Sequence, residues 1–204
     1  MHKDIFEAAA KGTVDDVRFF VEQGVDVNAK IGCNWTPLNY AVRFNSNVDI
    51  VKYLVENGAS VDVKSDRGWT PLHDAASGDD SSIDIVEFLI ENGADVNAKD
   101  DYNQTPLHWC VGADIPRIEV LKYLIEHGAD VNAKNLQGKT PLYELLNVVY
   151  SNNTAIDKVV EVLTYLIEQG ADVNASVTPL DLAVADEMKA VIREAGGKRG
   201  EDLP

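Results

Sequence analysis

One tripeptide, Thr-Pro-Leu, recurs along the chain at a nearly constant interval. It begins at residues 36, 70, 105, 140 and 178 of the 204-residue sequence, so successive copies start 34, 35, 35 and 38 residues apart. A Gly-Ala-x-Val block follows each of the first four copies, and a related block opens at Gly24. An interval of this length indicates one supersecondary unit repeated in tandem, each copy packing on its neighbours. Because no linker interrupts the interval, the pattern predicts a single elongated domain.

Each repeat predicts a pair of helices. Threonine is a good helix N-cap and proline suits the first helical position, so each triplet begins a first helix. Apolar residues then follow at helical spacing, as in Leu72, Ala75 and Ala76, and a second helix carries larger ones, as in Val86, Leu89 and Ile90. The glycine that opens each block is suited to end the second helix in a left-handed conformation. The Asp- and Asn-rich stretch before the next threonine predicts a turn or hairpin-like finger.

These motifs resemble the ankyrin repeat. The resemblance lies in Thr-Pro-Leu-His at 70–73 and 105–108, and in Gly-Ala-Asp-Val-Asn-Ala at 93–98, 128–133 and 170–175. It implies an all-α fold: a curved ankyrin-repeat solenoid of six stacked helix-turn-helix units with projecting β-turn or hairpin fingers. The first and last repeats are expected to act as polar caps. The implied domain spans 1–196, with repeats of approximately 1–31, 32–65, 66–100, 101–135, 136–175 and 176–196, and 197–204 form a flexible tail.

The fifth and sixth repeats depart from the common pattern. From Thr140 to Gly170 the chain runs 30 residues, against 22 or 23 in the three preceding repeats. The excess lies in 147–159, between the two helices, and we expect added helical turns around a polar loop. Thr178 follows Asn174 by only four residues, so the last finger is predicted to be nearly absent.

Charge and composition limit which classes of partner and which cellular compartments are expected. The net charge of −16 repels phosphate backbones and anionic membranes, so neither nucleic acid nor a membrane is an expected partner. No apolar stretch approaches the length of a membrane span, and the N-terminus lacks the pattern of a signal peptide. The two cysteines, 33 and 110, form no metal or disulfide motif, which fits a reducing compartment. A cytoplasmic monomer is the expectation, and export by a non-classical route is an open alternative.

No motif of catalysis or cofactor binding occurs in the sequence. Phosphate-binding loops, zinc-protease motifs, nucleophile elbows and calcium loops are all missing, so neither an enzyme nor a cofactor or metal site is expected. His73 and His108 hold equivalent positions in adjacent repeats, and we expect each to bond to backbone or hydroxyl groups near its helix start. Cys110 replaces an alanine of the buried stripe, and Cys33 lies on a finger.

The resemblance implies that partners bind at the finger tips and at the exposed side of the first helices, on the concave face. Counting from each threonine transfers these positions to this sequence. The candidate partner-binding residues are Cys33, Trp35, Tyr40, Arg43 and Phe44 in the second repeat; Asp66, Arg67, Trp69 and Asp74 in the third; Asp101, Tyr102, Gln104 and Trp109 in the fourth; and Leu136, Gln137, Lys139 and Glu144 in the fifth.

Two interpretations of these residues remain open. All three tryptophans fall in the set, and Trp, Tyr and Arg are enriched at the centres of protein interfaces. They therefore indicate a non-enzymatic module that binds a protein or peptide on this face. Alternatively, the rings serve only to pack neighbouring fingers. Other functions left open are an exported effector that sequesters host proteins, and a small-ligand-binding protein or enzyme that uses 147–159 as a lid.

Overall fold

The computed structural model describes residues 2–45, 47–78, 83–112, 117–152, 156–175, 179–183 and 185–199. These ranges contain helices but no strand, and one isolated antiparallel bridge joins Ile31 to Trp35. The predicted all-helical class is confirmed. The helices are α1 (Ile5–Lys11), α2 (Val14–Glu22), α3 (Pro37–Phe44), α4 (Val48–Glu56), α5 (Pro71–Ser77), α6 (Ile83–Glu91), α7 (Pro106–Val111), α8 (Ile118–Glu126), α9 (Pro141–Asn152), α10 (Ile156–Glu168), α11 (Pro179–Leu182) and α12 (Asp186–Glu194).

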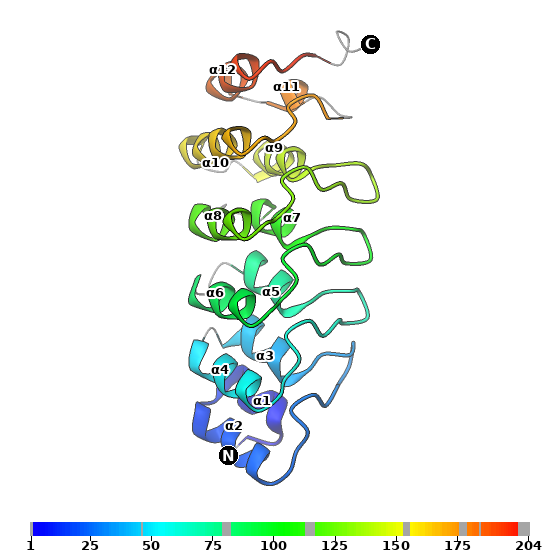
Figure 1. Ribbon diagram of the computed structural model, residues 1–204, viewed down its shortest axis with the longest axis vertical. Coiled ribbons are helices and arrows are strands. Elements are labelled where there is room, and N and C mark those ends of the chain that lie inside the picture. The colour runs from blue at the N-terminus through cyan, green and yellow to red at the C-terminus, as the bar shows by residue number, and fades with distance from the viewer. Residues whose placement is uncertain are drawn as a thin grey trace. The chain divides into compact units, whose positions relative to one another are not determined.

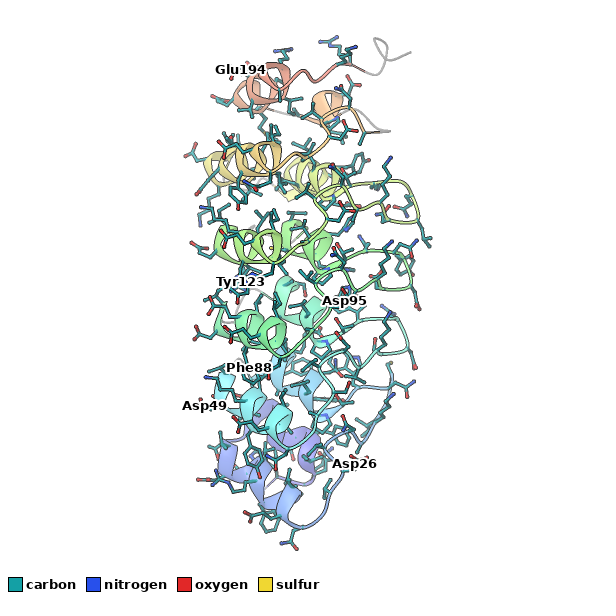
Figure 2. All side chains as sticks on the ribbon, viewed as in Figure 1. Asp26, Asp49, Phe88, Asp95, Tyr123 and Glu194 are labelled. Atoms are coloured by element: carbon teal, nitrogen blue, oxygen red, sulfur yellow. The ribbon has the colours of Figure 1, made fainter. Side chains whose placement is uncertain are left out.

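The chain divides into two compact units. The first is Met1–Asp101, which contains α1 to α6, and the second is Tyr102–Pro204, which contains α7 to α12. Within each unit the odd-numbered helices lie between the even-numbered helices and the projecting fingers (Figure 1). Asp49 on α4 and Phe88 on α6 mark the side away from the fingers (Figure 2). The predicted pairing of a first and a second helix in each repeat is therefore confirmed.

Every Thr-Pro-Leu triplet begins a helix at its proline, as predicted. The third residue of the helix bonds back to the capping threonine: Thr36 N donates to Asn39 Oδ1 at 3.0 Å, and Thr70 N donates to His73 Nδ1 at 3.1 Å. Thr105 and His108 repeat the same bond at 3.1 Å. Both histidines are buried, so their expected structural role at the helix start is confirmed.

The core combines small residues and one leucine near the start of each of α3, α5 and α7 with large aliphatic residues on the second helices. In the first unit α1 packs on α3, and α3 packs on α5, through fully buried alanines such as Ala9, Ala41 and Ala75. Leu54 and Leu89 fill the space beneath α4 and α6. Small side chains let the first helices approach closely, while burial of the leucines supplies most of the stabilising apolar area.

Asparagines of the repeated block join neighbouring repeats within each unit. In the first unit Asn28 Nδ2 donates to the Gly58 carbonyl at 2.8 Å, and its Oδ1 accepts from Ser60 N at 2.9 Å. In the second unit Asn132 makes the same pair of bonds with Gly170 and Asp172, at 2.9 and 2.7 Å. A primary amide is suited to this position because it both donates and accepts.

The long fifth repeat extends both of its helices. α9 has 12 residues, whereas the first helices α3, α5 and α7 have 8, 7 and 6. α10 has 13, whereas the second helices α4, α6 and α8 have 9 each. The predicted extra helical turns in 147–159 are confirmed. The polar loop expected between them falls on 153–155, which lie outside the described residues, as do 176–178 of the shortened last finger and 200–204 of the tail.

Candidate partner-binding surface

A pocket of about 500 Å³ opens in the first unit among two fingers and two first helices. Its walls come from the fingers at 31–35 and 65–69, from α3 and from α5. Eight of its lining residues belong to the predicted binding set, so the fold brings together side chains that the sequence places in two different repeats. These eight are Cys33, Trp35, Tyr40, Arg43, Phe44, Arg67, Trp69 and Asp74, and the remaining lining residues are Ile31, Gly32 and Ser65.

Three aromatic rings form one wall of the pocket. The ring of Trp35 lies 5.5 Å from Tyr40 and 5.9 Å from Phe44, measured between centroids, and Tyr40 and Phe44 are 5.8 Å apart. Tyr40 also meets Phe6 of α1 edge-on at 5.6 Å. Trp35 and Tyr40 are half-buried, whereas Phe44 is 57% exposed. The two interpretations of these rings thus apply to different members: Tyr40 contributes to packing, and Phe44 presents apolar surface to solvent.

The lining also holds a cation, a carboxylate and a second tryptophan. Arg43 Nη1 donates to Asp74 Oδ1 at 3.3 Å, and the Arg43 guanidinium lies 5.9 Å from the centroid of the Trp69 ring. Trp69 in turn stacks on His73. The prediction that Asp74 stands on the exposed side of its helix is wrong: Asp74 is 1% exposed, because Arg43 of the preceding repeat pairs with it where α3 packs on α5.

Burial dominates the electrostatics of Asp74. Removal of its carboxyl group from water raises the pKa to about 7, against the opposing influences of the Arg43 charge and the nearby Asn39 amide. Asp74 Oδ2 and Asn39 Nδ2 each have no hydrogen-bond partner of normal geometry, although the amide is close enough to favour the charged carboxylate. Near neutral pH, Asp74 is therefore poised between its charged and neutral forms.

This raised pKa makes the stability of the protein depend on pH. The folded state holds the proton of Asp74 more tightly than the unfolded state does. This proton therefore contributes fully to the free energy of unfolding below the unfolded pKa near 4, and its contribution is lost as the pH rises through about 7. Asp74→Asn is neutral throughout. We expect the unfolding free energy of this variant, relative to wild type, to rise by on the order of 2–3 kcal/mol from about pH 4 to pH 8. Urea unfolding across this range measures the difference, and a flat or falling difference would contradict the assignment.

Two further predicted residues of the first unit, Asp66 and Asp101, lie on the fingers outside the pocket lining. Both are exposed. The Asp66 side chain accepts a hydrogen bond from Asn34, and its backbone N–H donates to the Cys33 carbonyl at 3.0 Å. Asp101 N donates to the Arg67 carbonyl at 3.1 Å. Backbone bonds between consecutive fingers therefore fix the finger that carries Arg67.

The predicted residues of the second unit differ widely in exposure. Tyr102 and Leu136 are 59% and 64% exposed, while Trp109 is half-buried. Lys139 lies 4.8 Å from the centroid of the Tyr143 ring. Burial raises the pKa of Glu144, which accepts a hydrogen bond from Asn135 Nδ2 at 3.2 Å. Gln104 is half-buried and Gln137 is exposed.

Ile31 is the clearest functional candidate that the sequence analysis missed. The equivalent residue of later fingers bonds to its own finger: Ser65 Oγ accepts from Trp69 N at 3.2 Å, and Asn135 Oδ1 accepts from Lys139 N at 3.0 Å. Isoleucine can make no such bond, yet it stands 44% exposed at the pocket. The difference between Ile31 and the polar residues at the same finger position is visible in the sequence. The proximity of Asn39 to Asp74 is not, because Asp74 belongs to the next repeat.

The cysteines lie where the sequence predicts them. Cys110 is fully buried, and burial raises the pKa of its thiol to about 12, so it acts as a small apolar core residue. Cys33 is exposed on its finger. Across the described ranges, no three His, Cys, Asp or Glu side chains gather as metal ligands. Among the helices described, none is both long enough and apolar enough to cross a membrane.

Comparison with known proteins agrees with this architecture. The family profile for ankyrin repeats (3 copies) matches residues 5–100 and 82–176, which together span most of the chain. A comparison with curated proteins gives no match. Ankyrin repeats generally serve as protein–protein interaction modules, and the family is typically non-enzymatic. With its repeated helix pairs, its finger-to-finger bonds and this match, the chain belongs to the ankyrin-repeat family.

Proposed function

We propose that this protein is a non-enzymatic interaction module that binds a protein or extended peptide on its finger and first-helix face, with the first-unit pocket as the main contact. The observation that carries the proposal is the convergence of Trp35, Phe44, Trp69 and Arg43 on one pocket. Aromatic and arginine side chains dominate the energetics of protein interfaces when they line a recess. Phe44 and Ile31 add exposed apolar surface there.

The scaffold favours binding because little of it must be ordered on contact. Backbone bonds join Cys33 to Asp66 and Arg67 to Asp101, so consecutive fingers hold one another in place. A preorganised surface loses less conformational entropy on docking than a flexible one. This is the physical advantage of presenting binding residues on stacked repeats.

The same proposal includes the setting in which the module acts. We place it in the cytoplasm as a monomer, because an exposed thiol such as Cys33 persists in a reducing compartment. A net charge of −16 opposes binding to nucleic acid. A native-mass measurement of the purified chain tests whether it is a monomer, and fractionation of its source cell tests whether it is cytoplasmic.

A variant that removes two exposed side chains of the first-unit pocket tests the function. We expect Phe44→Ala and Arg67→Ala together to lower the amount of partner captured from the native lysate by about tenfold or more, because exposed interface anchors are lost without disturbing the core. The matched control combines Arg18→Ala and Phe19→Ala, which are exposed residues of α2 in the same unit. Quantitative mass spectrometry of the captured proteins gives the readout, with circular dichroism to verify folding. Equal losses in both variants would contradict the chosen face.

A further inference from the structure

We infer that the first-unit pocket selects an extended partner segment in which an aromatic or aliphatic residue is followed two positions later by an acidic one. This inference rests on the proposed function and specifies the chemistry of its partner. It follows from three features of the pocket: an oriented guanidinium, a second guanidinium without an ion pair, and an apolar wall next to both.

Contacts with Asp74 and Trp69 orient Arg43, which can donate further hydrogen bonds to a ligand. Its Nη1 bonds to the buried Asp74 carboxylate, and its flat group lies over Trp69. The side chain of Arg43 is nevertheless 41% exposed, and it makes no other hydrogen bond within the described residues. Most of its N–H groups thus have no partner within the described residues, and Arg43 lines the pocket. A guanidinium fixed in this way by a buried carboxylate is suited to a planar carboxylate ligand, which it can bind through two parallel bonds.

Arg67 supplies a second positive group at the same pocket. It is exposed and lines the pocket, and within the described part of the chain its guanidinium forms neither an ion pair nor a hydrogen bond. Its acidic neighbours on the fingers, Asp66 and Asp101, do not line the pocket. The only carboxylate in the lining is Asp74, whose Oδ2 is sealed from solvent and already adjoins Arg43. The groups within reach of a ligand are therefore two cations, and an incoming lysine or arginine would be repelled.

The apolar wall determines which residue of the partner segment lies near its acidic residue. Phe44 and Ile31 are 57% and 44% exposed, and Trp35 lies against Phe44. In an extended segment, side chains two positions apart point to the same face. An apolar residue followed two positions later by glutamate or aspartate can therefore cover the aromatic wall and reach the guanidinium groups together.

Short blocked peptides test this selectivity directly. The reference peptide is acetyl-Phe-Ala-Glu-Ala-amide, and its counterparts carry Gln or Lys in place of Glu, or Ala in place of Phe. A fifth peptide, acetyl-Ala-Ala-Ala-Phe with a free carboxyl end, tests a C-terminal carboxylate as the source. Indole N–H signals in NMR titrations report binding: Trp35 and Trp69 line the pocket, whereas Trp109 lies in the second unit and serves as an internal control.

We expect the Glu peptide to shift the Trp35 and Trp69 signals and to bind at least about fivefold more tightly at low salt than the Gln, Lys and Phe-less peptides. Arg67→Gln should reduce the Glu-to-Gln ratio toward one. The double variant Arg43→Gln with Asp74→Asn should do the same without leaving a buried carboxylate unpaired. Arg18→Gln is the matched control, because Arg18 pairs with Asp15 at 2.7 Å and lies over the Tyr53 ring but stands outside the pocket.

Several results would overturn the inference. Tighter binding of the Lys peptide would mean that the pocket selects a cation through Asp74, and tighter binding of the free-carboxyl peptide would replace the side chain by a chain end. Equal binding of the Glu and Gln peptides, or no shift of Trp35 and Trp69 in folded protein, would remove it altogether. These outcomes leave the proposed function standing if capture from lysate still depends on Phe44 and Arg67, so the two failures are distinguishable.

Discussion

Replacement of Leu72 by alanine is expected to lower the free energy of unfolding by about 2–5 kcal/mol. Leu72 is fully buried on α5, the helix that also carries His73 and Asp74. The shorter side chain loses apolar burial and leaves a cavity that the surrounding helices fill only in part. Equilibrium unfolding in urea, followed by circular dichroism, measures the change.

The matched control for this substitution is Leu136→Ala. Leu136 is 64% exposed on a finger, so its removal should change the unfolding free energy by no more than about 0.5 kcal/mol. A loss at Leu72 as small as that at Leu136 would mean that the first helices do not share the tightly packed core described above.

Gly68→Ala is expected to destabilise the protein by about 2–4 kcal/mol through two independent effects. Gly68 has a φ of +73°, in the left-handed region that side chains disfavour. A Cβ atom at Gly68 would also stand 2.9 Å from the backbone nitrogen of Asp101, closer than such atoms approach. Because the obstacle is backbone on the next finger, relief requires the two fingers to separate. Urea unfolding measures the loss, and the Trp69 signal in NMR reports whether the pocket is disturbed.

Gly58→Ala separates the two effects. Gly58 has a φ of +93°, but a Cβ there would meet no atom within 4 Å, so only the conformational cost of about 1–2 kcal/mol applies. Equal destabilisation by the two substitutions would show that the finger-to-finger approach at Gly68 contributes nothing.

The sequence predicts the local elements of this fold well, because each is determined by residues within one repeat. Thr-Pro begins a helix, glycine ends the next one, and the spacing of Leu72, Ala75 and Ala76 sets the buried face. The candidate residues that line the pocket follow from the resemblance to the ankyrin repeat, since counting from each threonine places Trp35 and Trp69 at equivalent finger positions.

Interactions between repeats were harder to predict. The sequence does not predict the burial of Asp74, because its partner Arg43 lies 31 residues earlier in the chain. The unusual pKa of Asp74 likewise depends on burial that only the packing of α3 on α5 creates. The Asn28 bonds to Gly58 and Ser60 belong to the same class, since an asparagine in a turn gives no sign of which neighbour it will reach.

Ile31 shows that some of this information is present in the sequence in another form. Where a repeat position normally carries a side chain that bonds to its own finger, as Ser65 and Asn135 do, Ile31 carries an exposed apolar side chain, and the Trp35 N–H bonds to the Ile31 carbonyl instead, at 3.1 Å. Exposed apolar residues that depart from the repeat pattern are therefore stronger functional candidates than residues that conform to it.

The most direct test of the central claim compares the proteins captured by wild type, by the variant in which Phe44 and Arg67 are alanine, and by the control variant in which Arg18 and Phe19 are alanine. If the finger and first-helix face binds the partner, the control retains the wild-type partners at similar amounts and the first variant loses them. If the first variant retains them while the control loses them, binding occurs on the second helices instead, and the account is wrong.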